Sequence, residues 1–192
     1  MWGEISYTSM TYTDLNGKLH MRKNIIIFIT MVVILLIFGS SIDHNFGRSY
    51  HHFLTKSTDL SKENIENIYL NEEIDDEKIV SKYGKISNFS QDNSLYNYYF
   101  LREGIEIATN KDDNKIIRFA VKDNDVNTEK GIKIGDKEDK VVKLYGDNYY
   151  TRLEQGANII GYVDKEKNWS IEFWLDENDR VDFYRFDYNF MK

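Results

Sequence analysis

An internal repeat is the feature that most constrains the fold of this 192-residue chain. Residues 74–85 read IDDEKIVSKYGK and residues 136–147 read DKEDKVVKLYGD, so a Lys-apolar-Val triplet and a Tyr-Gly pair recur at one constant offset. Similarity at a fixed offset indicates two copies of one supersecondary unit. The sequence therefore predicts a first repeat over residues 65–125 and a second over residues 126–192.

Each copy begins with the signals of a short helix. In the second copy, Asp136 is placed to accept hydrogen bonds from the first N–H groups of a helix over residues 137–145. In the first copy, Asp75 or Asp76 takes that capping position. Glycine readily adopts the left-handed backbone angle that ends a helix. We therefore expect positive φ at Gly84 and Gly146, directly after the two tyrosines.

After each helix the apolar pattern changes from a period near 3.6 to a period of 2, which is typical of β-strands. The expected strands lie at residues 96–100, 104–108, 116–121, 159–163, 169–175 and 180–188. Polar turns such as residues 110–114 and 176–179 separate them. We expect one continuous antiparallel sheet, with the short helices packed on one face and the other face left to bind a partner.

The run GIKIGDKEDKVVKLYG at residues 131–146, followed by strands and the turn IEFWLDENDRV at residues 171–181, resembles a known fold. It is similar to the helix-then-sheet repeat of the β-lactamase-inhibitor-protein-like fold and of the related small outer-membrane assembly lipoproteins. Gram-positive surface proteins of unassigned role carry similar tandem copies. The resemblance implies protein binding through the sheet face and its loops, and it transfers no specific contact residue. Two departures are the absence of cysteine and the lack of an Ile134-Gly135-Asp136 counterpart in the first copy.

A second feature is the apolar run from Ile25 to Phe38, which directly follows the basic residues Arg22 and Lys23. The run covers about 21 Å as a helix, against roughly 30 Å of hydrocarbon in a bilayer. The basic residues on its N-terminal side favour export of everything downstream. The sequence thus predicts an anchor over residues 21–41, in the membrane through residues 25–41, or alternatively a signal peptide cleaved near Ser41 and a secreted product.

The predicted fold class is accordingly α+β: an N-terminal membrane helix followed by two tandem helix-plus-antiparallel-sheet repeats. Residues 1–20 are either a cytosolic tail or, if Met21 is the true start, a mis-assigned beginning. Residues 42–64 are predicted to form a linker. The predicted localisation is the cell membrane, single-pass, with the C-terminal domain extracytoplasmic.

Composition narrows the possible functions. The formal net charge is −7, which disfavours nucleic acid as a partner because its phosphate backbone is itself negative. With no cysteine, the chain cannot use disulfides and must be stabilised by a hydrophobic core.

Candidate catalytic and metal-binding residues are few. All four histidines, His20, His44, His51 and His52, precede the repeats, so neither a Ser-His-Asp nor a Cys-His site is expected within them. The histidines of residues 44–52 fit a solvated spacer better than a metal site, and the acidic run at residues 72–77 fits helix capping better than a calcium site. Residues 123–134 fail the calcium-loop pattern at its glycine and glutamate positions. We predict no catalytic residue, no cofactor and no metal.

Aromatic strand residues are the remaining candidates for recognition, because tyrosine and tryptophan supply large and rigid contact area. We expect Tyr98, Tyr162 and Tyr188 to point outward and bind a protein partner in the cell envelope, with core packing as the alternative for the aromatic residues. The leading hypothesis is a membrane-anchored extracytoplasmic protein-binding module that is not an enzyme. The alternatives are a structural or envelope-assembly factor and a cell-wall hydrolase that uses carboxylates.

Overall fold

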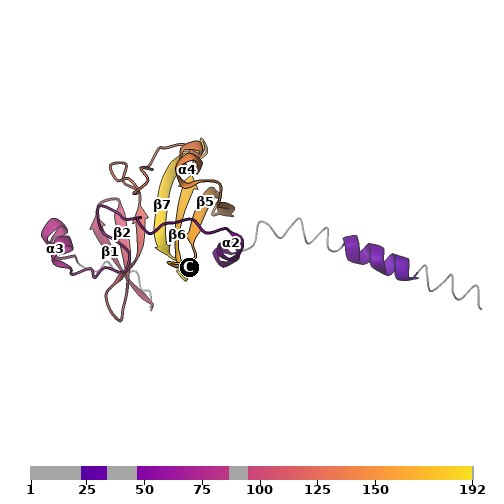
Figure 1. Cartoon of the computed structure of the whole chain (residues 1–192), viewed down its shortest axis with the longest axis horizontal. Helices are drawn as coiled ribbons and strands as arrows, with labels where there is room; N and C mark the ends of the chain where they lie inside the picture. The colour runs from indigo at the N-terminus through magenta and orange to yellow at the C-terminus, as the bar shows by residue number, and fades with distance from the viewer. Residues whose placement is uncertain (1–22, 34–46, 87–94, 192) are drawn as a thin grey trace, which may run out of the picture. The chain divides into compact units, whose positions relative to one another are not determined.

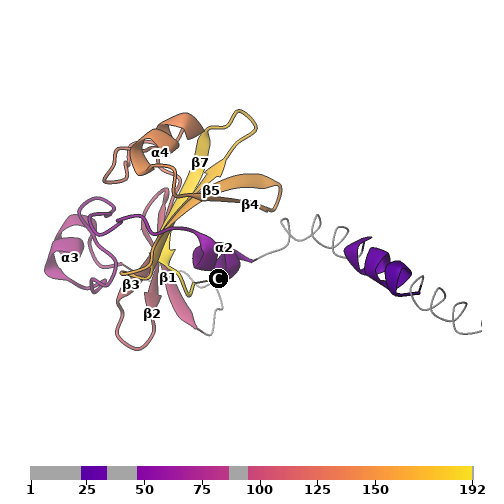
Figure 2. The same ribbon diagram turned by 45° about the vertical axis from the view of Figure 1, so that its right-hand side comes forward.

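The computed structural model describes residues 23–33, 47–86 and 95–191. The chain divides into two compact units, residues Met1–Asn45 and Phe46–Lys192. In the first unit, residues 23–33 are helical. The second unit carries the strands that the described residues form, and it is drawn in Figures 1 and 2.

The predicted membrane anchor is wrong for the described part of the chain, where no helix has the length and apolar character needed to cross a membrane. The predicted single-pass membrane localisation is corrected with it. Residues 34–41, which complete the predicted anchor and its cleavage site near Ser41, lie outside the described residues, as do residues 1–20 and Met21.

The second unit is built on a seven-stranded antiparallel sheet with the order β1-β2-β3-β7-β6-β5-β4. Its strands are β1 (Tyr96–Arg102), β2 (Ile105–Asn110), β3 (Ile116–Val121), β4 (Tyr150–Glu154), β5 (Ala157–Asp164), β6 (Trp169–Leu175) and β7 (Val181–Tyr188). The period of 2 in the sequence thus identified strands, and the expected continuous sheet is confirmed.

In the described part of this unit, three short helices accompany the sheet: α2 (Arg48–Leu54), α3 (Glu77–Tyr83) and α4 (Glu138–Tyr145). Asp76 caps α3 by accepting a hydrogen bond from the N–H of Lys78 at 3.0 Å. Lys137 rather than Asp136 takes the N-cap position of α4, and the Asp136 carboxylate instead accepts from the N–H of Lys133. The expected positive φ is confirmed at Gly84 (75°) and Gly146 (91°).

The two faces of the sheet differ in what covers them. Residues that alternate along the strands point to opposite faces. One face, here called the core face, packs against α3, α4 and the segment that precedes α3 in a single hydrophobic cluster, whose members include Ile79, Ile107, Phe119, Val141, Tyr145, Phe173 and Phe186. The opposite face is here called the open face. Helix α2 lies on it beside the C-terminal end of β7 in both views (Figures 1 and 2).

The predicted division into two tandem helix-plus-sheet repeats is wrong as a fold class. The strands form one layer in which β3 pairs with the last strand, β7, and one hydrophobic cluster runs through both predicted repeats. The physical reason is that β3 and β7 hydrogen-bond to each other across the boundary between the predicted repeats, and apolar residues of both repeats fill the same core.

The predicted linker also differs from the structure in its described part, residues 47–64. The backbone N–H of Thr58 donates to Val163 in β5, and that of Asn71 donates to Ile116 in β3, so the chain crosses the core face between these strands. Leu60 and Glu63 are buried on the way. The segment therefore belongs to the fold and is not a solvated spacer.

Candidate functional site

The open face carries charged side chains where the core face carries apolar ones. Glu172 in β6 and Asp187 in β7 have fully buried side chains, and arginines surround both. We call this group the ionic cluster, and its members are Arg48, Arg118, Arg152, Glu172, Arg185 and Asp187. A buried carboxylate is stable only when it is paired and hydrogen-bonded, and here both are.

Three guanidinium groups contact the carboxylate of Glu172. Arg152 donates from Nε to Oε1 at 2.7 Å, Arg185 donates from Nη2 to Oε2 at 2.6 Å, and Nε of Arg48 lies 3.1 Å from Oε2. Burial by itself raises the pKa of Glu172, but these positive charges outweigh it and hold the pKa well below its usual range. Glu172 is therefore a charged structural group.

Asp187 is satisfied mainly by its neighbours in register. Arg118 stands directly opposite on β3 and donates from Nε to Oδ2 at 2.9 Å, and Ser170 stands opposite on β6 and donates from Oγ to Oδ1 at 3.1 Å. Arg48 of α2 reaches the same carboxylate with both of its Nη atoms. The strand register thus determines the cluster.

A chain of hydrogen bonds extends the cluster toward β4. Tyr150 donates to Glu172 Oε1 at 2.6 Å, and His52 Nε2 lies 3.0 Å from the same tyrosine oxygen. A Cβ on Gly161 would lie 2.3 Å from the Tyr150 ring, so this position requires glycine. Burial, followed by the charge of Arg48, lowers the pKa of His52 to about 4, so this histidine is neutral near neutral pH.

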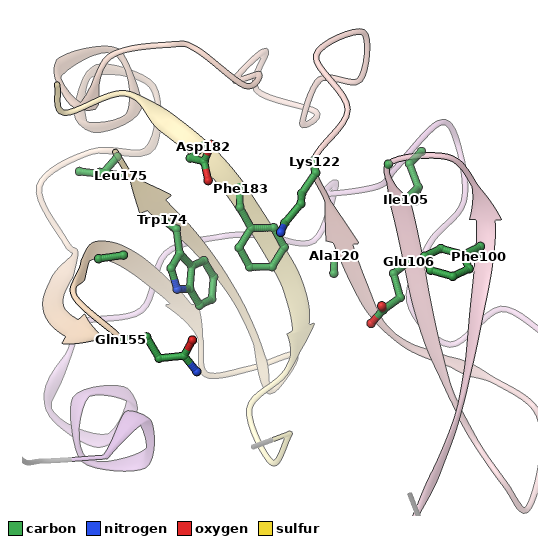
Figure 3. A pocket seen from close by; sticks show the side chains of 12 residues that line it. Phe100, Ile105, Glu106, Ala120, Lys122, Gln155, Trp174, Leu175, Asp182 and Phe183 are labelled. Carbon is green, nitrogen blue, oxygen red and sulfur yellow. The ribbon is translucent and has the colours of Figure 1, made fainter. Parts of the chain in front are cut away.

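Beside the cluster, the open face holds a groove of about 600 Å³. Figure 3 shows the Trp174 and Phe183 rings side by side on its floor, with the Lys122 side chain reaching toward Phe183. The two ring centroids are 4.6 Å apart, and Lys122 Nζ lies 5.5 Å from the Phe183 centroid. Glu106 and the exposed ring of Phe100 form one side, and Gln155 forms the other.

The ionic cluster also fixes the groove floor. The Arg185 guanidinium carbon lies 4.7 Å from the Trp174 ring centroid, and that of Arg152 lies 5.7 Å from it. Both arginines are held by Glu172, so the indole packs against cations that are themselves immobilised. The result is a rigid aromatic surface that remains partly open to solvent.

The structure places the three sequence-predicted tyrosines apart from one another. Tyr162 is fully buried on the core face and donates to the backbone oxygen of Gly146 at 3.0 Å. Tyr98 is only 8% exposed, in a small cluster with Ala108, Ile117 and Met191. Tyr188 is half-buried between Trp169 and Phe190. Tyr98 and Tyr162 do not point outward as expected, while partner binding by Tyr188 stays a prediction.

Glu63 is the main titratable group on the core face. It accepts hydrogen bonds from the hydroxyl of Tyr145 at 2.7 Å and from the N–H of Glu129 at 3.2 Å. Burial, opposed by these hydrogen bonds, raises its pKa to about 7. Both contacts hold the segment before α3 against α4 and its preceding loop.

Within the described residues, no group of three or more His, Asp or Glu side chains could hold a metal ion. Glu172 and Asp187 are fully buried and are bonded to arginines, Tyr150 and Ser170, so neither is open to a substrate in this structure. These two carboxylates therefore do not form the kind of acid and base pair that a glycosidase uses.

Sequence reasoning missed the ionic cluster, because none of its members was among the candidate residues. The available signal was a single charge inside an otherwise apolar strand, as in IIRFAV for Arg118 and WSIEFWL for Glu172. Such a charge is costly to bury without a partner, so several in adjacent strands indicate mutual pairing. Arg48 could not be found in this way because it lies in the predicted linker.

No family model and no curated protein matches this chain. Three solved structures share a distant likeness. A cysteine-rich secretory protein from Staphylococcus aureus subsp. aureus Mu50 is 14% identical, with a TM-score of 0.40, over 62% of this chain and 44% of that one. An extracellular protein containing a SCP domain from Bacillus anthracis str. Ames is 10% identical, with a TM-score of 0.44, over 69% of this chain and 48% of that one.

A DUF4309 family protein from Bacillus subtilis subsp. subtilis str. 168 is 14% identical, with a TM-score of 0.38, over 58% of this chain and 76% of that one. The chain thus spans less than half the length of the first two structures. With TM-scores under 0.5, these likenesses carry no argument about fold or function. The resemblance to the β-lactamase-inhibitor-protein-like fold stays a prediction.

Proposed function

We propose that this chain is a protein-binding module that engages its partner through the groove on the open face. The observation that carries the proposal is the partly exposed Trp174–Phe183 pair on the groove floor. Aromatic side chains and arginines supply most of the energy at protein interfaces, above all where a rigid ring sits in a pocket. The groove combines such rings with the exposed cation Lys122 at its rim.

The rigidity of the floor supports protein binding as well. Trp174 is fixed by Arg152 and Arg185, so little side-chain entropy is lost when a partner covers it. Five other aromatic residues of the sheet are buried in the core cluster, whereas Phe183, Trp174 and the more exposed Phe100 face the groove; the buried five are Phe119, Tyr162, Phe173, Tyr184 and Phe186.

The test compares capture of partners from the native source by wild-type protein and by the Trp174→Ala variant. We expect Trp174→Ala to reduce capture by more than tenfold, the loss typical of an interface hot spot. Leu153→Ala is the matched control, because Leu153 is 52% exposed on the edge strand β4 and does not line the groove. Equal capture by wild type and Trp174→Ala would show that the partner does not bind in the groove.

Trp174→Ala also removes packing from two arginines, so a second variant is needed. Lys122→Glu changes an exposed side chain at the rim and leaves the ionic cluster intact. Reduced capture by Lys122→Glu, together with an unchanged thermal midpoint, would separate recognition from folding. A saturable complex favours a binding module, whereas a permanent complex of fixed stoichiometry favours the structural-assembly alternative.

A further inference from the structure

Helix α2 is held on the open face by polar contacts and by the rings of His51 and His52, which lie against the ring of Tyr150. Of its seven residues only His52 is buried, and the apolar side chains of Tyr50, Phe53 and Leu54 are exposed. Its N-cap residue is Gly47, which has no side chain to cap the helix. A helix this short is not stable in isolation, so α2 depends on its docking to the sheet.

Arg48 makes four of the hydrogen bonds that dock α2. Its Nη1 donates to Asp187 Oδ2 at 3.2 Å and to the backbone oxygen of Met191 at 2.7 Å, and its Nη2 donates to Ser170 Oγ at 2.5 Å. Nη2 also donates to Asp187 Oδ1. These acceptors match the planar fork of a guanidinium group, which an ammonium group cannot reproduce.

The sheet part of this site is complete without α2. Asp187 keeps Arg118 and Ser170, while Glu172 keeps Arg152 and Arg185. Departure of Arg48 would therefore leave neither carboxylate unpaired, and the acceptors for a guanidinium group would stay in place. The acceptors of the site thus belong to the sheet and its C-terminal end, and helix α2 contributes only the guanidinium group that occupies it.

We propose that Arg48 is an internal ligand and that the site formed by Ser170, Glu172, Asp187 and the Met191 carbonyl receives an arginine side chain of the protein partner when α2 leaves the sheet. This inference rests on the proposed function, because the groove supplies the rest of the interface. The two sites are contiguous through Arg185, which lies 4.7 Å from the Trp174 ring and 2.6 Å from Glu172. A tethered ligand has an effective concentration on the order of millimolar, so a partner must use the groove as well to displace it.

The inference is tested with N-ethylguanidinium as the probe and ethylammonium as the control ion. In the full chain carrying Arg48→Ala, millimolar N-ethylguanidinium should refill the empty site and raise the thermal midpoint by about 2 °C relative to ethylammonium at equal ionic strength. The wild-type protein, whose site is filled, should show no difference between the two ions. No difference in the variant would overturn the inference.

If Arg48→Ala fails to fold, Arg48→Lys is the second variant, because it keeps the positive charge and lacks the planar guanidinium group. The amide of Thr55, which donates to His51 at the end of α2, should then exchange with solvent more than tenfold faster than in wild type, while sheet amides stay protected. Ser49→Ala, at an exposed position of the same helix, is the control and should exchange as wild type does. Wild-type exchange in Arg48→Lys would also overturn the inference. Failure here leaves Trp174-dependent capture unaffected, so the two proposals are tested separately.

Discussion

Neighbouring positions on the same three strands are apolar on one face of the sheet and charged or polar on the other. On the core face, residues in register across β3, β7 and β6 form an apolar row, Phe119, Phe186 and Ile171. One position away on the open face, the corresponding row is Arg118, Asp187 and Ser170. The first row is stabilised by removing apolar surface from water, whereas the second depends on complete pairing of charges that are costly to bury. An apolar row tolerates small losses, but an ionic row with one partner removed leaves a buried charge.

The largest expected effect comes from breaking the ionic row. Asp187→Ala removes the carboxylate that Arg48 and Arg118 share, and we expect the free energy of unfolding to fall by about 3–5 kcal/mol. Phe173→Ala on the core face should cost a similar amount, about 3–5 kcal/mol, through cavity formation. Denaturant unfolding measures both, with Asp182→Ala at an exposed position as the control. A loss for Asp187→Ala as small as that of the control would show that the open face contributes little to stability.

The second effect is a pH dependence that separates the two faces. The pKa of Glu63 is raised from 4.5 to about 7 in the folded state, so its contribution to stability is full below pH 4.5 and is lost as the pH rises through 7. The pKa of His52 is lowered from 6.5 to about 4, so its contribution is full above pH 6.5 and is lost as the pH falls through 4. Each contribution is on the order of 3 kcal/mol, and the two oppose each other between pH 4.5 and 6.5.

Replacing one of the two groups at a time should reveal the pH dependence of stability that they cancel in the wild type. Glu63→Gln is expected to lose stability as the pH falls from 6.5 toward 4.5, whereas His52→Gln is expected to lose stability as the pH rises from 4.5 toward 7. Thermal midpoints across this range measure both slopes against the flatter wild-type profile. Slopes of the same sign in the two variants would contradict the assignment of opposed groups to the two faces.

A smaller effect is expected at Gly161. Its substitution by alanine would place a Cβ 2.3 Å from the Tyr150 ring and push that ring away from Glu172, at a cost of about 1–3 kcal/mol. Gly156→Ala is not a suitable control, because the φ of 86° at Gly156 strains any side chain. Ala157→Ser, at the next residue of the same hairpin, is the control. Equal unfolding midpoints for Gly161→Ala and wild type would mean that Tyr150 can move without loss.

The smallest effect is expected at the rim of the groove on the open face. Lys122→Ala removes an exposed side chain at the groove rim, and we expect the free energy of unfolding to change by less than about 0.5 kcal/mol. A larger change would place Lys122 in the stabilising network together with the ionic cluster. The expected result would mark the groove as surface that is available for binding.

Local patterns in the sequence predicted much of the fold. The alternating residues around Ile171 and Phe186 identified strands, and the Tyr-Gly pairs identified helix ends, because both depend on short-range backbone preferences. The same patterns were misleading at longer range. Similar local segments around Gly84 and Gly146 suggested two tandem units, but which strands pair across them depends on burial shared by the whole sheet.

What the sequence by itself determined is the set of short elements, their order and the lack of a disulfide or a histidine-based site in the repeats. Tertiary structure alone decided that Arg48 meets Asp187 over 139 positions of chain and that Trp174 lies beside Arg152 and Arg185. The physical reason is that a charge in a strand is unfavourable until its partner is known, and the partner is chosen by strand register and by the docking of α2. The groove and the ionic cluster therefore emerge only when the seven strands have assembled.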